Sequence, residues 1–115
     1  MFQDKMVLCA SSAYEKKFYL NENFEGLPQH VKDELKIMCV LFTEDVGGVL
    51  SLEFDENGNL ELNTSADEGD LLYDEIGSVL KIKQIQQEKQ ELFESLETYY
   101  KVFFLGEDIE DDNGD

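Results

Sequence analysis

Period-two alternation of apolar and polar residues is clearest over residues 49–64, where it predicts a β-hairpin. A two-residue Asn-Gly turn would place Phe54 opposite Glu61, which mixes apolar and acidic side chains on one face. A three-residue loop that ends at Gly58 instead places Phe54 opposite Leu60 and keeps that face apolar. We therefore predict the three-residue loop, with Gly58 in a left-handed backbone conformation.

A weaker alternation near the N-terminus predicts a second hairpin. Residues 5–10 form its first strand and residues 14–20 its second, with a turn at residues 11–13. In the second strand, Phe18 and Leu20 share the apolar face. In the first strand, one face is expected to carry Met6, Leu8 and Ala10. The other face is expected to carry Val7 and Cys9.

Residues 28–46 repeat their apolar positions with the period of a helix and predict an amphipathic helix. Pro28 suits the first helical position, and a pair of glycines ends the helix. Ile37, Val40 and Leu41 widen its apolar stripe, so we expect this helix to be covered on more than one side. The stripe itself consists of Val31, Leu35, Met38, Cys39, Phe42 and Val46.

Residues 70–105 are helical by composition, but they are too many for one straight helix in a compact domain. Unbroken, they would span about 54 Å, whereas a compact domain of this length is roughly 35 Å across. Their apolar face also changes direction, because Leu72, Ile76 and Val79 point about 150° away from the later apolar residues. We therefore predict a kink or break near residues 77–81, the alternative being a straight helix that serves two partners.

These elements follow one another as ββαββα and predict an α+β domain. We expect an antiparallel sheet of about four strands covered by helices, although the pattern does not define the strand order. The domain is expected to occupy residues 1–106. Residues 107–115 include six acids and are expected to form an acidic, solvated tail.

The charge balance argues against several classes of partner. The chain has 115 residues with 27 acids and 9 basic residues, all of them lysine, for a formal net charge of −18. Proteins that bind a nucleic-acid backbone or an anionic membrane surface carry clusters of Lys and Arg. We therefore expect no direct nucleic-acid binding and no membrane binding. Because the N-terminus lacks a secretory pattern and the cysteines are few, we expect a cytoplasmic protein.

No catalytic, cofactor or metal site is predicted from the residue pattern. His30 is the only histidine, and Cys39 lies about 13–14 Å further along the same predicted helix, too far for an activating hydrogen bond. Two separated cysteines and one histidine do not make a zinc site, and the turn around Asn57 lacks the spacing of a calcium loop. Cys9 and Cys39 are therefore expected to be inert core thiols.

Acidic and aromatic side chains are the candidates for a surface that binds another protein. Residues 49–69 and residues 107–115 each sum to a charge of −6, which together make two thirds of the total. Aromatic residues at helical spacing are more typical of a core, but they also form partner surfaces. The candidate residues are Glu53, Asp55, Glu56, Glu61, Asp67, Glu68, Tyr99, Tyr100 and Phe104.

Several short stretches are similar to those of a known family. They are residues 13–17 (AYEKK), 37–48 (IMCVLFTEDVGG), 52–60 (LEFDENGNL), 73–78 (YDEIGS) and 104–109 (FLGEDI). Over nearly the whole chain the sequence resembles a family of small, acidic, uncharacterised proteins from Gram-positive anaerobic bacteria. That family is a domain of unknown function, so the resemblance implies an intact domain in a bacterial cytosol but neither an activity nor site residues.

The absence of catalytic motifs from the sequence favours a non-catalytic protein-interaction or regulatory module with a protein partner. A homodimer through the C-terminal helix would cover the second apolar face of that helix. One alternative is an anionic decoy, a nucleic-acid mimic that occupies the basic surface of another protein. Another alternative is a small enzyme that uses carboxylates or a divalent ion.

Overall fold

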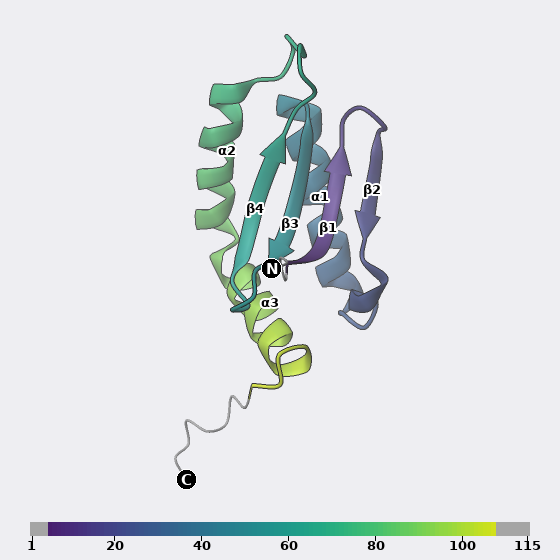
Figure 1. The fold of residues 1–115 in the computed structure, drawn as a ribbon, viewed down its shortest axis with the longest axis vertical. Coiled ribbons are helices and arrows are strands. Elements are labelled where there is room, and N and C mark those ends of the chain that lie inside the picture. Colours follow the sequence, from purple (N-terminus) through teal and green to yellow (C-terminus); the bar gives the residue numbers. More distant parts are fainter. Residues whose placement is uncertain (1–4, 108–115) are drawn as a thin grey trace.

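A computed structural model describes residues 5–107, which form an α+β domain (Figure 1). The predicted fold class is confirmed, with two helices in place of the single C-terminal one. Apart from Glu107, the predicted acidic tail at residues 107–115 lies outside the described residues. The elements are β1 (Met6–Ser12), β2 (Lys17–Leu20), the 3-10 turn η1 (Glu22–Phe24), α1 (Gln29–Val46), β3 (Val49–Phe54), β4 (Leu60–Ser65), α2 (Glu75–Glu88) and α3 (Gln90–Phe103).

The four strands form one antiparallel sheet in the order β2-β1-β3-β4. α1 packs across β1, β2 and β3, α2 lies beside α1, and α3 contacts both α2 and the edge strand β4 (Figure 1). The core lies between the sheet and these helices. The other face of the sheet carries polar side chains such as Ser51 and Glu53 on β3, which explains the polar half of the alternating pattern.

The β3–β4 hairpin has the predicted register. Phe54 pairs with Leu60, and Gly58 adopts the left-handed conformation with φ of 89°. Asp55 holds the loop, because its backbone N–H donates to the carbonyl of Asn59 at 2.9 Å and its carboxylate accepts from the Asn59 backbone N–H at 2.9 Å. Only the three-residue loop satisfies both the apolar face and these turn hydrogen bonds.

A β-bulge in β1 overturns the predicted faces of that strand. The pairing of β1 with β3 shifts register between Val7 and Cys9, and Leu8 and Cys9 are both fully buried. Ala10 is thereby moved to the polar face, where it lies opposite Ser51. A bulge adds one residue to one strand and inverts the alternation beyond it. The run of apolar residues here gave no sign of where that inversion occurs.

α1 buries the predicted stripe, but its wider apolar face is not covered. Leu35, Cys39 and Phe42 are fully or almost fully buried against the sheet. Ile37 and Leu41 are 58% and 59% exposed, so the expectation that the helix is covered on more than one side is wrong for these residues. The sequence pattern marked them as apolar, but it could not distinguish a second covering element from solvent.

The break in the C-terminal helical region is at Lys89, not at the predicted residues 77–81. Asp74 caps α2 by accepting from the Gly77 backbone N–H at 2.8 Å, so Gly77 belongs to the first turn of an intact helix. Lys89 has φ of −108° and ψ of 22° and separates the two helices. At this residue the chain passes from α2, which lies beside α1, to α3, which contacts the edge strand β4. The change in direction of the apolar face after Val79 reflects two environments, because the residues up to Val79 are exposed whereas later apolar residues such as Ile85 are buried.

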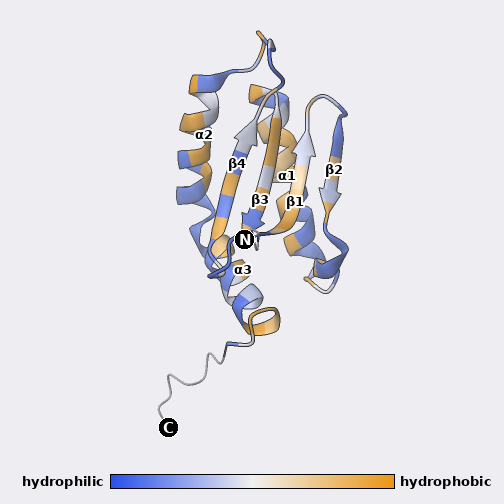
Figure 2. Cartoon of the chain, in the orientation of Figure 1, coloured by the Kyte–Doolittle hydropathy of each residue, from blue (hydrophilic) through white to orange (hydrophobic). Residues whose placement is uncertain are grey.

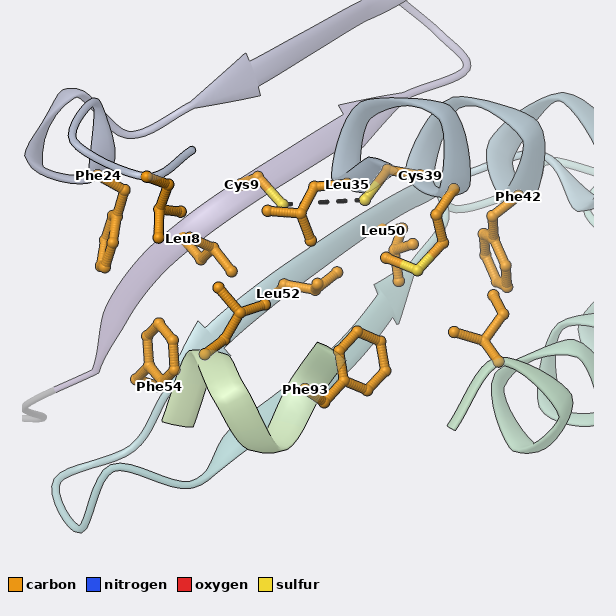
Figure 3. Close-up of a cluster of buried hydrophobic side chains, with 14 of the residues drawn as sticks. Leu8, Cys9, Phe24, Leu35, Cys39, Phe42, Leu50, Leu52, Phe54 and Phe93 are labelled. Carbon is orange, nitrogen blue, oxygen red and sulfur yellow. Dashed lines mark hydrogen bonds between the residues drawn. The ribbon is translucent and has the colours of Figure 1, made fainter. Parts of the chain in front are cut away.

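The core combines aliphatic residues of the sheet with thiols of β1 and α1 and with stacked aromatic rings. Figure 3 shows Leu50, Leu52 and Phe54 of β3 directed toward α1 and α3. At the α3 end, the rings of Phe54 and Tyr100 stack with centroids 4.2 Å apart. This dense packing explains why the C-terminal region remains attached to the sheet despite its many charges.

Candidate interaction surfaces

The six predicted acidic candidates fall in two separate places, four at the hairpin end of β3 and β4 and two in the loop after β4. Glu53 and Glu61 lie opposite each other on the face of the sheet turned away from α1, where Lys5 pairs with Glu61 at 3.0 Å. The hairpin tip and the loop after β4 lie at opposite ends of β4, about 20 Å apart by strand geometry (Figure 1). The tip carries Asp55 and Glu56, and the loop carries Asp67 and Glu68. The fold therefore does not gather these acids into one surface.

The three aromatic candidates belong to the cluster around the end of α3. Tyr100 is buried, with its ring against Phe54, and it does not form an outer surface. Phe104 is half-buried, with its ring centroid 4.9 Å from that of Phe24, and Tyr99 is half-buried as well. A role in binding a partner stays a prediction for Tyr99 and Phe104, whose main contacts here are with the core.

The two thiols lie together in the core and away from the histidine. Cys9 Sγ and Cys39 Sγ are 3.9 Å apart, and both residues are fully buried (Figure 3). The hydrogen bond with Cys39 and the burial raise the pKa of Cys9 well above its ordinary value, so the neutral thiol is favoured at neutral pH. His30 is exposed at the start of α1. The thiols are thus suited to packing rather than to nucleophilic chemistry.

Residues 5–107 contain neither a metal-binding cluster nor a membrane-spanning helix. In this range, no group of three or more His, Cys, Asp or Glu side chains converges in a way that could hold a metal ion. No helix in the same part of the chain combines the length and the apolar composition needed to cross a membrane.

A groove of about 560 Å³ runs between α1 and α2 on the outer side of the helical layer. Its floor contains Met38 and Phe42, which also belong to the core, together with the exposed side chains of Ile37 and Leu41. Ile85 of α2 closes the opposite side. An apolar floor that is continuous with a core is a common form of site for an apolar ligand or a partner helix.

The rim of the groove carries charges from both helices. Lys81 and Lys89 are neutralised by ion pairs with Asp45 at 2.6 Å and Glu34 at 2.9 Å. Asp33 and Glu88 accept instead from the side-chain amides of Gln29 and Gln84, at 2.9 and 3.0 Å. Among the described residues neither Asp33 nor Glu88 forms an ion pair, so the rim presents two carboxylates without a cation.

Sequence reasoning missed this groove although it named several of its residues. Ile37 and Leu41 were recognised as apolar positions outside the main stripe. Their spacing of i and i+4 puts them on one face, and this was the available signal. That α2 lies beside α1 and forms the second wall depends on the packing of residues far apart in the chain.

Comparison with known proteins supplies a family but no activity. Neither the curated proteins nor the solved structures include a match to the chain. A family model described as a family of unknown function, DUF6145, matches residues 5–108. The resemblance to a domain of unknown function is thereby confirmed, whereas an origin in Gram-positive anaerobes stays a prediction. The match extends over almost the entire sequence, and the chain therefore belongs to the DUF6145 family of unknown function.

Proposed function

We propose that this chain is a cytoplasmic, non-catalytic protein-interaction module that binds a basic amphipathic helix of a bacterial protein partner in the α1–α2 groove. The observation that carries the proposal is the apolar floor at Ile37 and Leu41, each more than half exposed on a helix whose other face forms the core. A helix that presents apolar side chains every three or four residues could cover both.

The charges of the rim indicate the chemistry of the partner. Asp33 on α1 and Glu88 on α2 line the same groove and have no cation in the described part of the chain. Lysine or arginine residues beside the apolar face of the partner helix would supply those cations. Such rim pairs contribute mainly to specificity and association rate, while burial of apolar surface supplies most of the affinity.

The anionic-decoy alternative has less support from the described residues. A mimic of nucleic acid needs acids in a continuous row, but the acids around β3 and β4 are divided between the hairpin end of the sheet and the loop after β4, about 20 Å apart by strand geometry. The groove has both a concave apolar floor and uncompensated carboxylates. We therefore rest the proposal on the groove.

Titration of a fluorescent peptide tests this function. The probe is a synthetic amphipathic helix with leucines on one face and lysines beside them, and its control has glutamates in place of the lysines. We expect the basic peptide to bind at least about tenfold more tightly than the acidic one, and less tightly at high salt. Backbone amide NMR shifts should change along α1 and α2.

Two matched variants locate the binding surface. Ile37→Asp should weaken peptide binding at least about tenfold, because it places a charge in the apolar floor of the groove. Val79→Asp is the control, since Val79 is 54% exposed on another side of α2 and does not line the groove. Equal binding by the two variants, or no binding of the basic peptide by the native chain, would exclude the groove as this site.

A further inference from the structure

A second uncovered apolar surface lies on the outer side of α2. Ile76, Val79 and Leu80 are 76%, 54% and 63% exposed, and Leu72 just before the helix is 93% exposed. Ile76, Val79, Leu80 and Lys83 follow helical spacing and so share one face, which we call the α2 outer face. Figure 2 shows hydrophobic colouring at the tip of the loop before α2 and along that helix. This face is separate from the groove.

The segment that leads into α2 is held firmly against the rest of the domain. The Tyr14 hydroxyl donates to the Asp70 carboxylate at 2.5 Å and accepts from the backbone N–H of Asp67 at 2.9 Å. The backbone N–H of Asp74 donates to the carbonyl of Val46 at 2.9 Å. The exposed apolar residues are thus presented by an anchored helix. A preorganised surface of this kind loses little entropy on binding.

Charge along α2 is distributed unevenly from one end to the other. Asp74 and Glu75 lie at its N-terminal end, where they also suit the helix dipole. Lys83 lies two turns further along on the outer face, and within residues 5–107 it forms no ion pair. The face therefore begins with acids and ends with an unpaired cation.

This arrangement is self-complementary when two α2 helices run antiparallel. Glu75 and Lys83 lie four residues on either side of Val79, or about 6 Å each way along the helix. A two-fold axis at Val79 places Glu75 of each copy level with Lys83 of the other, and apolar residues meet between them. Parallel pairing would instead bring like charges together, which is unfavourable.

We propose that the chain forms a two-fold symmetric homodimer through antiparallel pairing of the α2 outer faces, with Val79 at the axis. The second copy covers Ile76, Val79 and Leu80, while Glu75 and Lys83 fix the direction of pairing. The net charge of −18 opposes approach of two copies, but salt at 0.15 M screens it beyond about 8 Å. Contact at the outer face then outweighs the residual repulsion.

Sedimentation equilibrium of the full chain at physiological salt tests the dimer. The native chain should be dimeric at tens of micromolar and dissociate on dilution. Val79→Asp should be monomeric at every concentration, since each interface would contain two buried, uncompensated charges. Ile37→Asp, which changes the groove and not this face, should remain dimeric. A monomeric native chain, or a Val79→Asp variant that dimerises like the native chain, would overturn the proposal.

A charge exchange tests the antiparallel direction. Glu75→Lys and Lys83→Glu should each weaken dimerisation about tenfold, because symmetry repeats each unfavourable contact twice. The double variant, Glu75→Lys with Lys83→Glu, should recover most of the native dimerisation constant. Additive losses in the double variant would refute this pairing. Circular dichroism of every variant confirms that the fold is retained, as expected for substitutions at exposed positions.

These tests separate the dimer from the peptide-binding function. If Ile37→Asp loses peptide binding but keeps the native dimerisation constant, the substitution has affected the groove alone. If Val79→Asp loses the dimer but keeps the native peptide affinity, the substitution has affected the α2 outer face alone. Either proposal can therefore fail without the other.

Discussion

The helices α2 and α3 have the same length but opposite relations to the core. Each contains 14 residues. α3 buries Phe93, Leu96 and Tyr100 against the sheet, whereas α2 buries only Ser78 and Ile85. The apolar residues of α2 lie mostly on its exposed side. The difference teaches that α3 buries most of its apolar face within the chain and leaves only Phe103 strongly exposed, whereas α2 leaves most of its apolar face uncovered.

The largest expected difference between these helices is in stability. Leu96→Ala in α3 should lower the free energy of unfolding by about 2–5 kcal/mol, because it leaves a cavity in the core. Leu80→Ala in α2 should change it by less than about 0.5 kcal/mol when the protein is dilute. Urea unfolding followed by circular dichroism measures both values.

Protein concentration sharpens that comparison. A dimer through α2 would make the Leu80→Ala effect grow as the protein is concentrated, while the Leu96→Ala effect would persist at every concentration. Similar losses from the two substitutions in dilute protein would show that the exposed face of α2 is packed, contrary to the structure.

The second difference concerns the glycines next to the two helices. Gly58 in the hairpin has φ of 89°, and a side chain there would meet Lys101 Cγ of α3 at 2.7 Å. Gly69 in the loop before α2 has φ of 85° and no neighbour within 4 Å of an added Cβ. Gly69→Ala should therefore cost about 1–2 kcal/mol from backbone strain alone. Gly58→Ala should cost roughly 1 kcal/mol more because it also crowds α3.

Thermal unfolding of both glycine variants checks the expected order. Equal losses would mean that the Lys101 side chain moves aside freely, in which case the hairpin does not limit the position of α3. A larger loss at Gly69 would contradict the view that the loop before α2 has open space around it.

The smallest expected effect is a pH dependence of the hairpin beneath α3. Backbone N–H donation, from Asn59 above all, lowers the pKa of the Asp55 carboxyl below its ordinary value. The ionised group therefore stabilises the folded state above pH values near 4, and this contribution is lost as the pH falls through the lowered pKa. Asp55→Ala should cost about 0.5–1 kcal/mol at pH 7 by loss of turn hydrogen bonds.

The pH profile of urea unfolding measures this contribution. The stability difference between the native chain and Asp55→Ala should shrink below about pH 4. Asp55→Asn is the matched control, because its amide oxygen can still accept from the turn but does not titrate. If the difference in unfolding free energy between the native chain and Asp55→Ala stays constant from pH 7 to pH 3, the charge of Asp55 does not contribute to stability.

The local sequence pattern predicted the structure correctly where residue spacing and turn residues alone define it. Alternation and turn chemistry predicted the β3–β4 register with Gly58 in the left-handed region, and the period of 3.6 predicted the buried stripe of α1. The sequence was misleading at the bulge in β1 and at the helix break. The bulge lies within an unbroken apolar run, and the break at Lys89 depends on where α3 meets the sheet.

The candidate site was less predictable than the fold, because a groove requires two walls from distant parts of the chain. The apolar character of Ile37 and Leu41 was visible in the sequence, but their exposure was not. The acids were equally visible, and their separation to opposite ends of β4 depended on the hairpin as folded.

By itself, the sequence determined the α+β class, most of the elements and the large negative charge, because these follow from residue type and local periodicity. Only the tertiary structure decided which apolar residues the chain covers and which it leaves exposed. Burial is a property of contacts between distant residues, and the same apolar side chain can pack in a core or face a partner. In this protein that decision separates Leu96 in the core from Val79 on the surface.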